Sequence, residues 1–140
     1  MSYLLDTNIV SELRKVESGR ADPRVRAWSQ NLIAESTFLS VITVLELERG
    51  VLLMERRDRK QGAMLRTWFE SLVLPDFAGR ILPVDFSIAK RCAALHVPDP
   101  KSYRDSLIAA TALVHGLTVV TRNVRHFYNT GVSILDPWEE

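Results

Sequence analysis

The chain has 140 residues, of which 46% are hydrophobic and 25% are charged, and its formal net charge is +1. This length fits one compact domain with a sizeable core, and the composition argues against a disordered chain or a coiled coil. A net charge so close to zero excludes an overall attraction to nucleic acid, so a polyanion would have to be held by a local patch or through a metal.

The single cysteine, Cys92, excludes an internal disulfide framework and is interpreted as a small packed residue. No apolar run approaches the ~20 residues that are needed to cross a bilayer. No basic segment precedes an apolar stretch at the amino terminus, so the start of the chain does not resemble a signal peptide. We therefore expect a cytoplasmic protein.

Short strand-like segments alternate with helical segments along the chain. Strands are expected at residues 2–5, 37–40, 80–84, 117–121 and 132–135. Helices are expected at residues 7–15, 23–33, 43–59, 63–72, 86–96 and 102–115, with Gly62 as the interruption between the third and the fourth. Because such alternation needs crossover connections, it predicts a parallel sheet covered on both faces. The sequence has no internal repeat or long linker, so one α/β domain is expected over residues 1–140.

The first strand-like segment ends in an acid. Asp6 directly follows Tyr3-Leu4-Leu5, and the carboxyl ends of strands are where open α/β sheets bind ligands. The same acid could instead cap the following helix, a role that Thr7 or Asn8 could also fill. Taken alone, Asp6 leaves both interpretations open.

A second acid lies inside an otherwise apolar helical stretch. Glu46 falls on the same helical stripe as Ile42 and Leu53. An ionised carboxylate buried there needs a cation or a strong hydrogen-bond partner, and Arg49 could serve. Periodicity alone does not separate Glu46 from Glu48.

A third acid, Asp105, begins a helix of small residues, where the helix dipole favours negative charge whatever the function. Three carboxylates brought together repel one another, and a pair ~4 Å apart costs about 4 kcal/mol at an effective dielectric of about 20. A divalent cation removes this conflict, and Mg²⁺ or Mn²⁺ suits oxygen ligands. Zinc is disfavoured because the three histidines and the cysteine show no ligand spacing.

Four motifs follow one another between residues 4 and 123. They are Leu5-Asp6-Thr7-Asn8, the segment Ser40–Gly50 with Thr43 and Glu46, the segment Asp105–Ala112, and Thr121-Arg122-Asn123. In this order they resemble the motifs of PIN-domain ribonucleases, specifically the VapC-type toxins of bacterial toxin–antitoxin pairs. The segment Phe77–Asp85 and the ending Asp136-Pro137-Trp138 look closer still to the FitB-like branch.

The resemblance implies a three-layer α/β/α domain with a central parallel sheet and a cluster of acids at its carboxyl-terminal edge. It selects Glu46 over Glu48, and it implies a catalytic set of Asp6, Glu46, Asp105 and Asn123. Asp6 and Asp105 would bind the metal directly, and Glu46 would bind it or position a water. Many members have a fourth acid at or near Asn123, so we expect one well-held Mg²⁺ or Mn²⁺ and a second only alongside RNA phosphate.

The resulting hypothesis is metal-assisted hydrolysis of RNA phosphodiester bonds that leaves a 5′-phosphate. Candidates for holding phosphate or a metal-bound water are Thr7, Asn8, Arg122 and His126, and helix capping and surface charge are the alternatives for them. The resemblance also implies a homodimer and a cognate VapB-type antitoxin, and operator DNA would be bound by the antitoxin.

Two other functions remain open. The first is a PIN-like protein of weak catalytic power that binds RNA or an antitoxin, which the neutral Asn123 favours. The second is an aspartyl-phosphate phosphatase with Asp6 as nucleophile. The phosphatase is disfavoured because Asn8 stands where a second acid is needed, and because no lysine lies near a late strand end.

Overall fold

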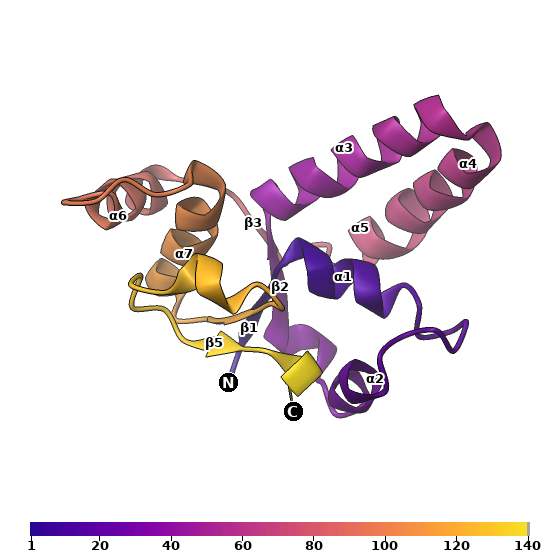
Figure 1. The fold of residues 1–140 in the computed structure, drawn as a ribbon, viewed down its shortest axis with the longest axis horizontal. Coiled ribbons are helices and arrows are strands. Elements are labelled where there is room, and N and C mark those ends of the chain that lie inside the picture. The colour runs from indigo at the N-terminus through magenta and orange to yellow at the C-terminus, as the bar shows by residue number, and fades with distance from the viewer. Residues whose placement is uncertain (140) are drawn as a thin grey trace.

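Five parallel strands form the centre of the computed structural model, which describes residues 1–139 (Figure 1). The sheet order is β3-β2-β1-β4-β5, and every neighbouring pair is parallel. The strands are β1 (Tyr3–Leu5), β2 (Thr37–Ser40), β3 (Ile81–Leu82), β4 (Thr118–Val120) and β5 (Ile134–Leu135). Because β1 lies in the middle, the residue that follows it stands at the centre of the carboxyl-terminal edge.

The strands are joined by helices and short helical turns. The helices are α1 (Thr7–Leu13), α2 (Pro23–Gln30), α3 (Val41–Arg57), α4 (Arg59–Trp68), α5 (Leu74–Asp76), α6 (Phe86–Leu95) and α7 (Tyr103–His115). The turns are η1 (Ala34–Ser36), η2 (Phe69–Val73), η3 (Val124–Phe127) and η4 (Pro137–Glu139). In Figure 1, α3 and α4 form a hairpin that extends away from the sheet, and α6 lies beside α7 on the other side. No helix within residues 1–139 is long and apolar enough to cross a membrane.

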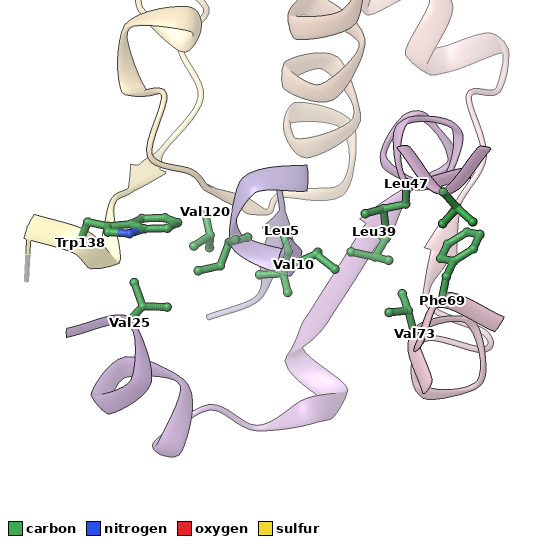
Figure 2. Close-up of a cluster of buried hydrophobic side chains, with 11 residues drawn as sticks. Leu5, Val10, Val25, Leu39, Leu47, Phe69, Val73, Val120 and Trp138 are labelled. Atoms are coloured by element: carbon green, nitrogen blue, oxygen red, sulfur yellow. The ribbon is translucent and has the colours of Figure 1, made fainter. Parts of the chain in front are cut away.

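Two apolar clusters cover the two faces of the sheet. Successive side chains of a strand point to opposite faces, and Leu5 and Val120 belong to one cluster while Leu4 and Val119 belong to the other. Figure 2 shows the first cluster, to which α1, α2, α3, η2 and η4 contribute residues. The second takes three buried residues from α7 (Ile108, Ala109 and Ala112), joined by Leu4, Leu117, Val119 and Phe127. This arrangement confirms the predicted three-layer α/β/α domain.

The boundaries of several elements differ from the prediction, and one difference has a clear cause. The interruption expected at Gly62 is wrong, because the break between the long helices falls at Asp58. The Asp58 side chain accepts a hydrogen bond from the Gln61 backbone N–H and caps α4. Gly62 lies inside α4, where an added Cβ would stand 2.4 Å from the Cα of Glu55. The glycine therefore permits close packing of α4 on α3.

Candidate functional site

The topology brings the three predicted acids to one edge of the sheet. Asp6 directly follows β1, and Glu46 lies in α3, which begins directly after β2. Asp105 lies in the first turn of α7, which leads back to the start of β4. Because β1 and β2 are parallel neighbours, their carboxyl ends meet at the same edge. All three carboxylates contact one side chain, Arg104.

Asp6 both caps a helix and faces the site. The Asp6 side chain is fully buried, and its Oδ1 accepts hydrogen bonds from the Thr7 backbone N–H over 2.8 Å and from Arg104 Nη2 over 2.5 Å. Its Oδ2 accepts from the Thr121 hydroxyl over 2.8 Å and from Asn8 Nδ2 over 3.5 Å. The cap of α1 is therefore Asp6 itself, and Thr7 is the first residue of that helix.

Glu46 lies at the edge of the buried face of α3. The buried residues of this helix are Thr43, Leu47 and Val51, whereas Leu53, which was placed on the stripe of Glu46, is 59% exposed. The side chain of Glu46 is 24% exposed. The acid therefore borders the core and does not lie within it.

The ion-pair partner of Glu46 is Arg104, whereas the sequence suggested Arg49. Arg104 Nε and Nη2 donate to the two carboxylate oxygens of Glu46, and the Thr7 hydroxyl donates to Oε1. Burial raises the pKa of the Glu46 carboxyl, but the hydrogen bonds from Arg104 and Thr7 outweigh burial and hold that pKa below its ordinary value. Glu46 is thus held in its ionised form.

Arg104 is the residue of this site that the sequence analysis missed. Its guanidinium donates to Asp6 and Glu46, and through Nη1 to Asp105 Oδ1 over 2.9 Å. Burial lowers the pKa of Arg104, but the bonds to Glu46 and Asp6 outweigh burial and raise the pKa above its ordinary value. In the sequence, Arg104 directly precedes Asp105, which was already a candidate. This adjacency is the signal that could have pointed to Arg104.

The segment after β4 supports the same edge. Thr121, which is fully buried, donates to Asp6 and accepts from Asn8 Nδ2 over 3.1 Å and from the Asn123 backbone N–H over 3.0 Å. The Asn8 side-chain oxygen in turn accepts from the Arg122 backbone N–H over 3.1 Å. Thr121 and Asn8 therefore join the carboxyl ends of β1 and β4. Thr121 belongs to the fourth sequence motif, from which its contact with Asp6 could not be predicted.

The remaining candidates lie nearer the surface. Asn123 is exposed and precedes η3. The Arg122 guanidinium lies over the Trp138 ring, with 5.3 Å from Cζ to the ring centroid. His126 Nδ1 lies 3.7 Å from Asp105 Oδ2. Of these three side chains, His126 is the one with a recorded contact to the acids.

The chemistry of the donors fits Mg²⁺ or Mn²⁺. The carboxylates of Asp6, Glu46 and Asp105 and the Thr7 hydroxyl are hard oxygen ligands of the kind that these ions prefer. As the side chains stand, no group of three His, Cys, Asp or Glu residues within the described chain is arranged to hold a metal ion. The positive group that all three carboxylates contact is the guanidinium of Arg104.

Comparisons with known proteins all indicate the same family. A family model described as the PIN domain matches residues 3–132. The chain is 39% identical over 141 residues to VapC ribonuclease Y4jK of Sinorhizobium fredii, with 97% of each sequence covered. It is 39% identical over 147 residues to toxin FitB of Neisseria gonorrhoeae, with 98% of this chain and 99% of that protein covered. The crystal structure of FitAcB from Neisseria gonorrhoeae superposes with a TM-score of 0.89 at 38% identity and 99% coverage of both chains.

Proposed function

The chain belongs to the PIN-domain family, and from this premise we propose that it is the ribonuclease toxin of a type II toxin–antitoxin pair. In this proposal it hydrolyses RNA phosphodiester bonds with Mg²⁺ or Mn²⁺ held by its acids. The observation that carries the proposal is the convergence of Asp6, Glu46 and Asp105 on a single cationic group. Three carboxylates from three separate segments, gathered at the ligand-binding edge of a parallel sheet, are suited to binding a cation.

Each acid has a proposed task. Asp6 and Asp105 would hold the metal, and Glu46, whose Oε1 accepts from the Thr7 hydroxyl, would hold it or position a water. The chemistry that a bound Mg²⁺ or Mn²⁺ supplies is a water of lowered pKa and neutralisation of charge on the phosphate. Thr7, Asn8, Arg122 and His126 remain predicted contacts for phosphate or water. His126, close to Asp105, has the most direct support.

We expect a single well-held metal in the free protein. Asn123, at the place of a fourth acid, offers a neutral amide, and it is exposed at the start of η3. The loss of one negative charge weakens the binding of a second metal ion more than the binding of the first. A metal titration that finds two equally tight sites without RNA would contradict this expectation.

The proposed partner is a VapB-type antitoxin. The relatives include toxin FitB, and the solved structures similar to this chain include FitAB bound to a DNA fragment, with a TM-score of 0.87. We propose that a cognate antitoxin binds this chain, that the antitoxin carries the contacts to operator DNA, and that the toxin is a homodimer. The cytoplasmic location stays a prediction.

We also propose that the single domain occupies residues 1–140, beyond the matched range 3–132. Trp138 is 4% exposed and belongs to the first apolar cluster (Figure 2). The end of the chain therefore contributes to the core. Residue 140 lies outside the described residues.

The test is cleavage of a mixed RNA pool by the wild type and by Asp6→Asn. Wild-type cleavage should require Mg²⁺ or Mn²⁺ and leave 5′-phosphates, and Asp6→Asn should lower the rate about 100-fold or more. The matched control is Asp85→Asn, because Asp85 also caps a helix, α6, after a strand. Asp85→Asn should cleave at the wild-type rate. Cleavage that persists in chelator, or in Asp6→Asn, would contradict the proposal.

One observation favours the second candidate, a protein that binds RNA or an antitoxin without cutting. The carboxylates are already neutralised in part by Arg104, which reduces their mutual repulsion in the absence of metal. RNA binding that is independent of metal, with no cleavage in either Mg²⁺ or Mn²⁺, would establish this function in place of the first.

A further inference from the structure

We infer that Arg104 is a further functional residue of this site, because its guanidinium competes with the divalent metal for Asp6, Glu46 and Asp105. Metal binding then requires the guanidinium to leave the three carboxylates. The inference rests on the proposed function, since it concerns the same acids and the same metal. It adds a residue to which neither the motifs nor the comparisons assign a role.

The guanidinium contacts the oxygens that a metal would need. Arg104 donates to Asp6 Oδ1, to both oxygens of Glu46 and to Asp105 Oδ1 over 2.5–2.9 Å. The other oxygen of Asp6 accepts from Thr121 and Asn8, and Asp6 is fully buried. A metal that binds Asp6 through Oδ1 would therefore compete with Arg104 for that oxygen.

Electrostatic attraction would drive the replacement of the Arg104 guanidinium by a metal ion. Three carboxylates and one guanidinium leave a net charge of about −2 at the site, which still attracts a divalent cation. A guanidinium and a metal ion held by the same oxygens would repel each other, so the two cannot occupy the cluster together. The side chain of Arg104 is 28% exposed at the start of α7. Part of the side chain is therefore already in contact with solvent.

Arg66 forms an ordinary surface ion-pair network with which the contacts of Arg104 can be compared. Arg66 is also 28% exposed and also contacts three carboxylates, those of Glu48, Glu55 and Glu70. Those carboxylates are 37–49% exposed, and they belong to α3 (Glu48 and Glu55) and to η2 (Glu70). The acids around Arg104 are only 0–24% exposed. Competition with a cation is stronger where water screens less, so Arg66 serves as the matched control.

The test is a calorimetric titration of Mn²⁺ into the wild type, Arg104→Gln, Arg66→Gln and Asp6→Asn. Arg104→Gln should bind Mn²⁺ about tenfold more tightly than the wild type, because the competing charge is gone. Arg66→Gln should bind as the wild type does, and Asp6→Asn should bind weakly. Equal or weaker binding by Arg104→Gln would overturn the inference and leave the proposed function standing. Absence of binding in both the wild type and Arg104→Gln would overturn both.

A second measurement follows Arg104 in the wild-type protein and uses a variant only to assign its signal. With ¹⁵N-labelled arginine, the Nε–H signal of Arg104 is identified by its loss in Arg104→Lys, which keeps a positive charge. Addition of Mg²⁺ should shift or broaden this signal and leave that of Arg66 unchanged. An Arg104 signal that stays in place while calorimetry shows bound metal would overturn the inference.

Discussion

Arg104 forms a bidentate pair with Glu46, in which Nε lies 2.8 Å from Oε2 and Nη2 lies 2.7 Å from Oε1. The pair joins the start of α7 to α3 across 58 residues of sequence. Such fork-like pairing is among the stronger charge-assisted hydrogen-bond geometries in proteins. It fixes the position of Glu46 beside Asp6 and Asp105. The arrangement of the three acids therefore depends on the guanidinium of Arg104.

The first prediction concerns pH. The folded-state pKa of Glu46 lies below its ordinary value of 4.5, so ionised Glu46 contributes stability above about pH 4.5. That contribution is lost as the pH falls through the lower, folded-state pKa. In chelator, the free energy of unfolding of the wild type should exceed that of Glu46→Gln at neutral pH, and the difference should vanish in acid. Urea unfolding at a series of pH values measures it.

The control for this prediction is Glu35→Gln in η1, where the side chain is exposed. Substitutions at such surface positions change stability by less than about 0.5 kcal/mol. If the difference between the wild type and Glu46→Gln were the same at every pH, the pair between Glu46 and Arg104 would not exist in solution.

The second prediction concerns Thr121, whose hydroxyl donates to the buried carboxylate of Asp6 over 2.8 Å. Thr121→Val keeps the shape of the side chain and removes this bond, together with the two that the hydroxyl accepts from Asn8 Nδ2 and from the Asn123 backbone N–H. A hydrogen bond to a charged group alone contributes about 1.5–3 kcal/mol. We expect the free energy of unfolding to fall by about 2 kcal/mol and the rate of RNA cleavage to fall with it. Thr121→Ser keeps the hydroxyl and should retain most of both. If Thr121→Val were as stable as the wild type, or if Thr121→Ser lost as much stability as Thr121→Val, the hydroxyl would not have the stabilising role that we assign to it.

The third prediction concerns a buried hydroxyl with no hydrogen bond. Thr43 lies on the buried face of α3, and its Oγ1 has no partner among the described residues. An unpaired buried polar group destabilises the folded state, so Thr43→Val should raise the free energy of unfolding by about 1 kcal/mol. The control is Thr111→Val in α7, because the buried Thr111 hydroxyl donates to the Leu107 carbonyl over 2.7 Å. Thr111→Val should lower the free energy of unfolding. A loss of similar size in Thr43→Val would show that the Thr43 hydroxyl is hydrogen-bonded.

The sequence predicted the framework of the site because periodicity and order along the chain determine it. Alternating strands and helices predicted the parallel sheet, and a parallel sheet brings the carboxyl ends of β1 and β2 together. Asp6 could be placed at that edge by its position alone. Glu46 and Asp105 needed the resemblance to a family, because an acid at the edge of a helix face looks the same whether it binds a cation or solvent.

The contacts that depend on three dimensions could not be read from the sequence. Arg104 reaches Asp6 across 98 residues of sequence, and Thr121 reaches Asp6 across 115. No local pattern encodes the direction in which such a side chain points. Gly62 was misread for a related reason, because a glycine that allows close helix packing and one that ends a helix look identical in a sequence.

The fourth prediction tests this account of Gly62. An added Cβ would stand 2.4 Å from the Cα and 2.7 Å from the N of Glu55, so Gly62→Ala must separate α4 from α3. Overpacking of this kind costs about 1–3 kcal/mol, and a clash with backbone atoms belongs in the upper part of that range, above the roughly 1 kcal/mol that alanine contributes inside a helix. Gly50, inside α3, is the matched control, since its added Cβ would meet nothing within 4 Å. Denaturant unfolding should show that Gly62→Ala is destabilised and Gly50→Ala stabilised, and stabilisation of both variants would mean that Gly62 serves no packing role.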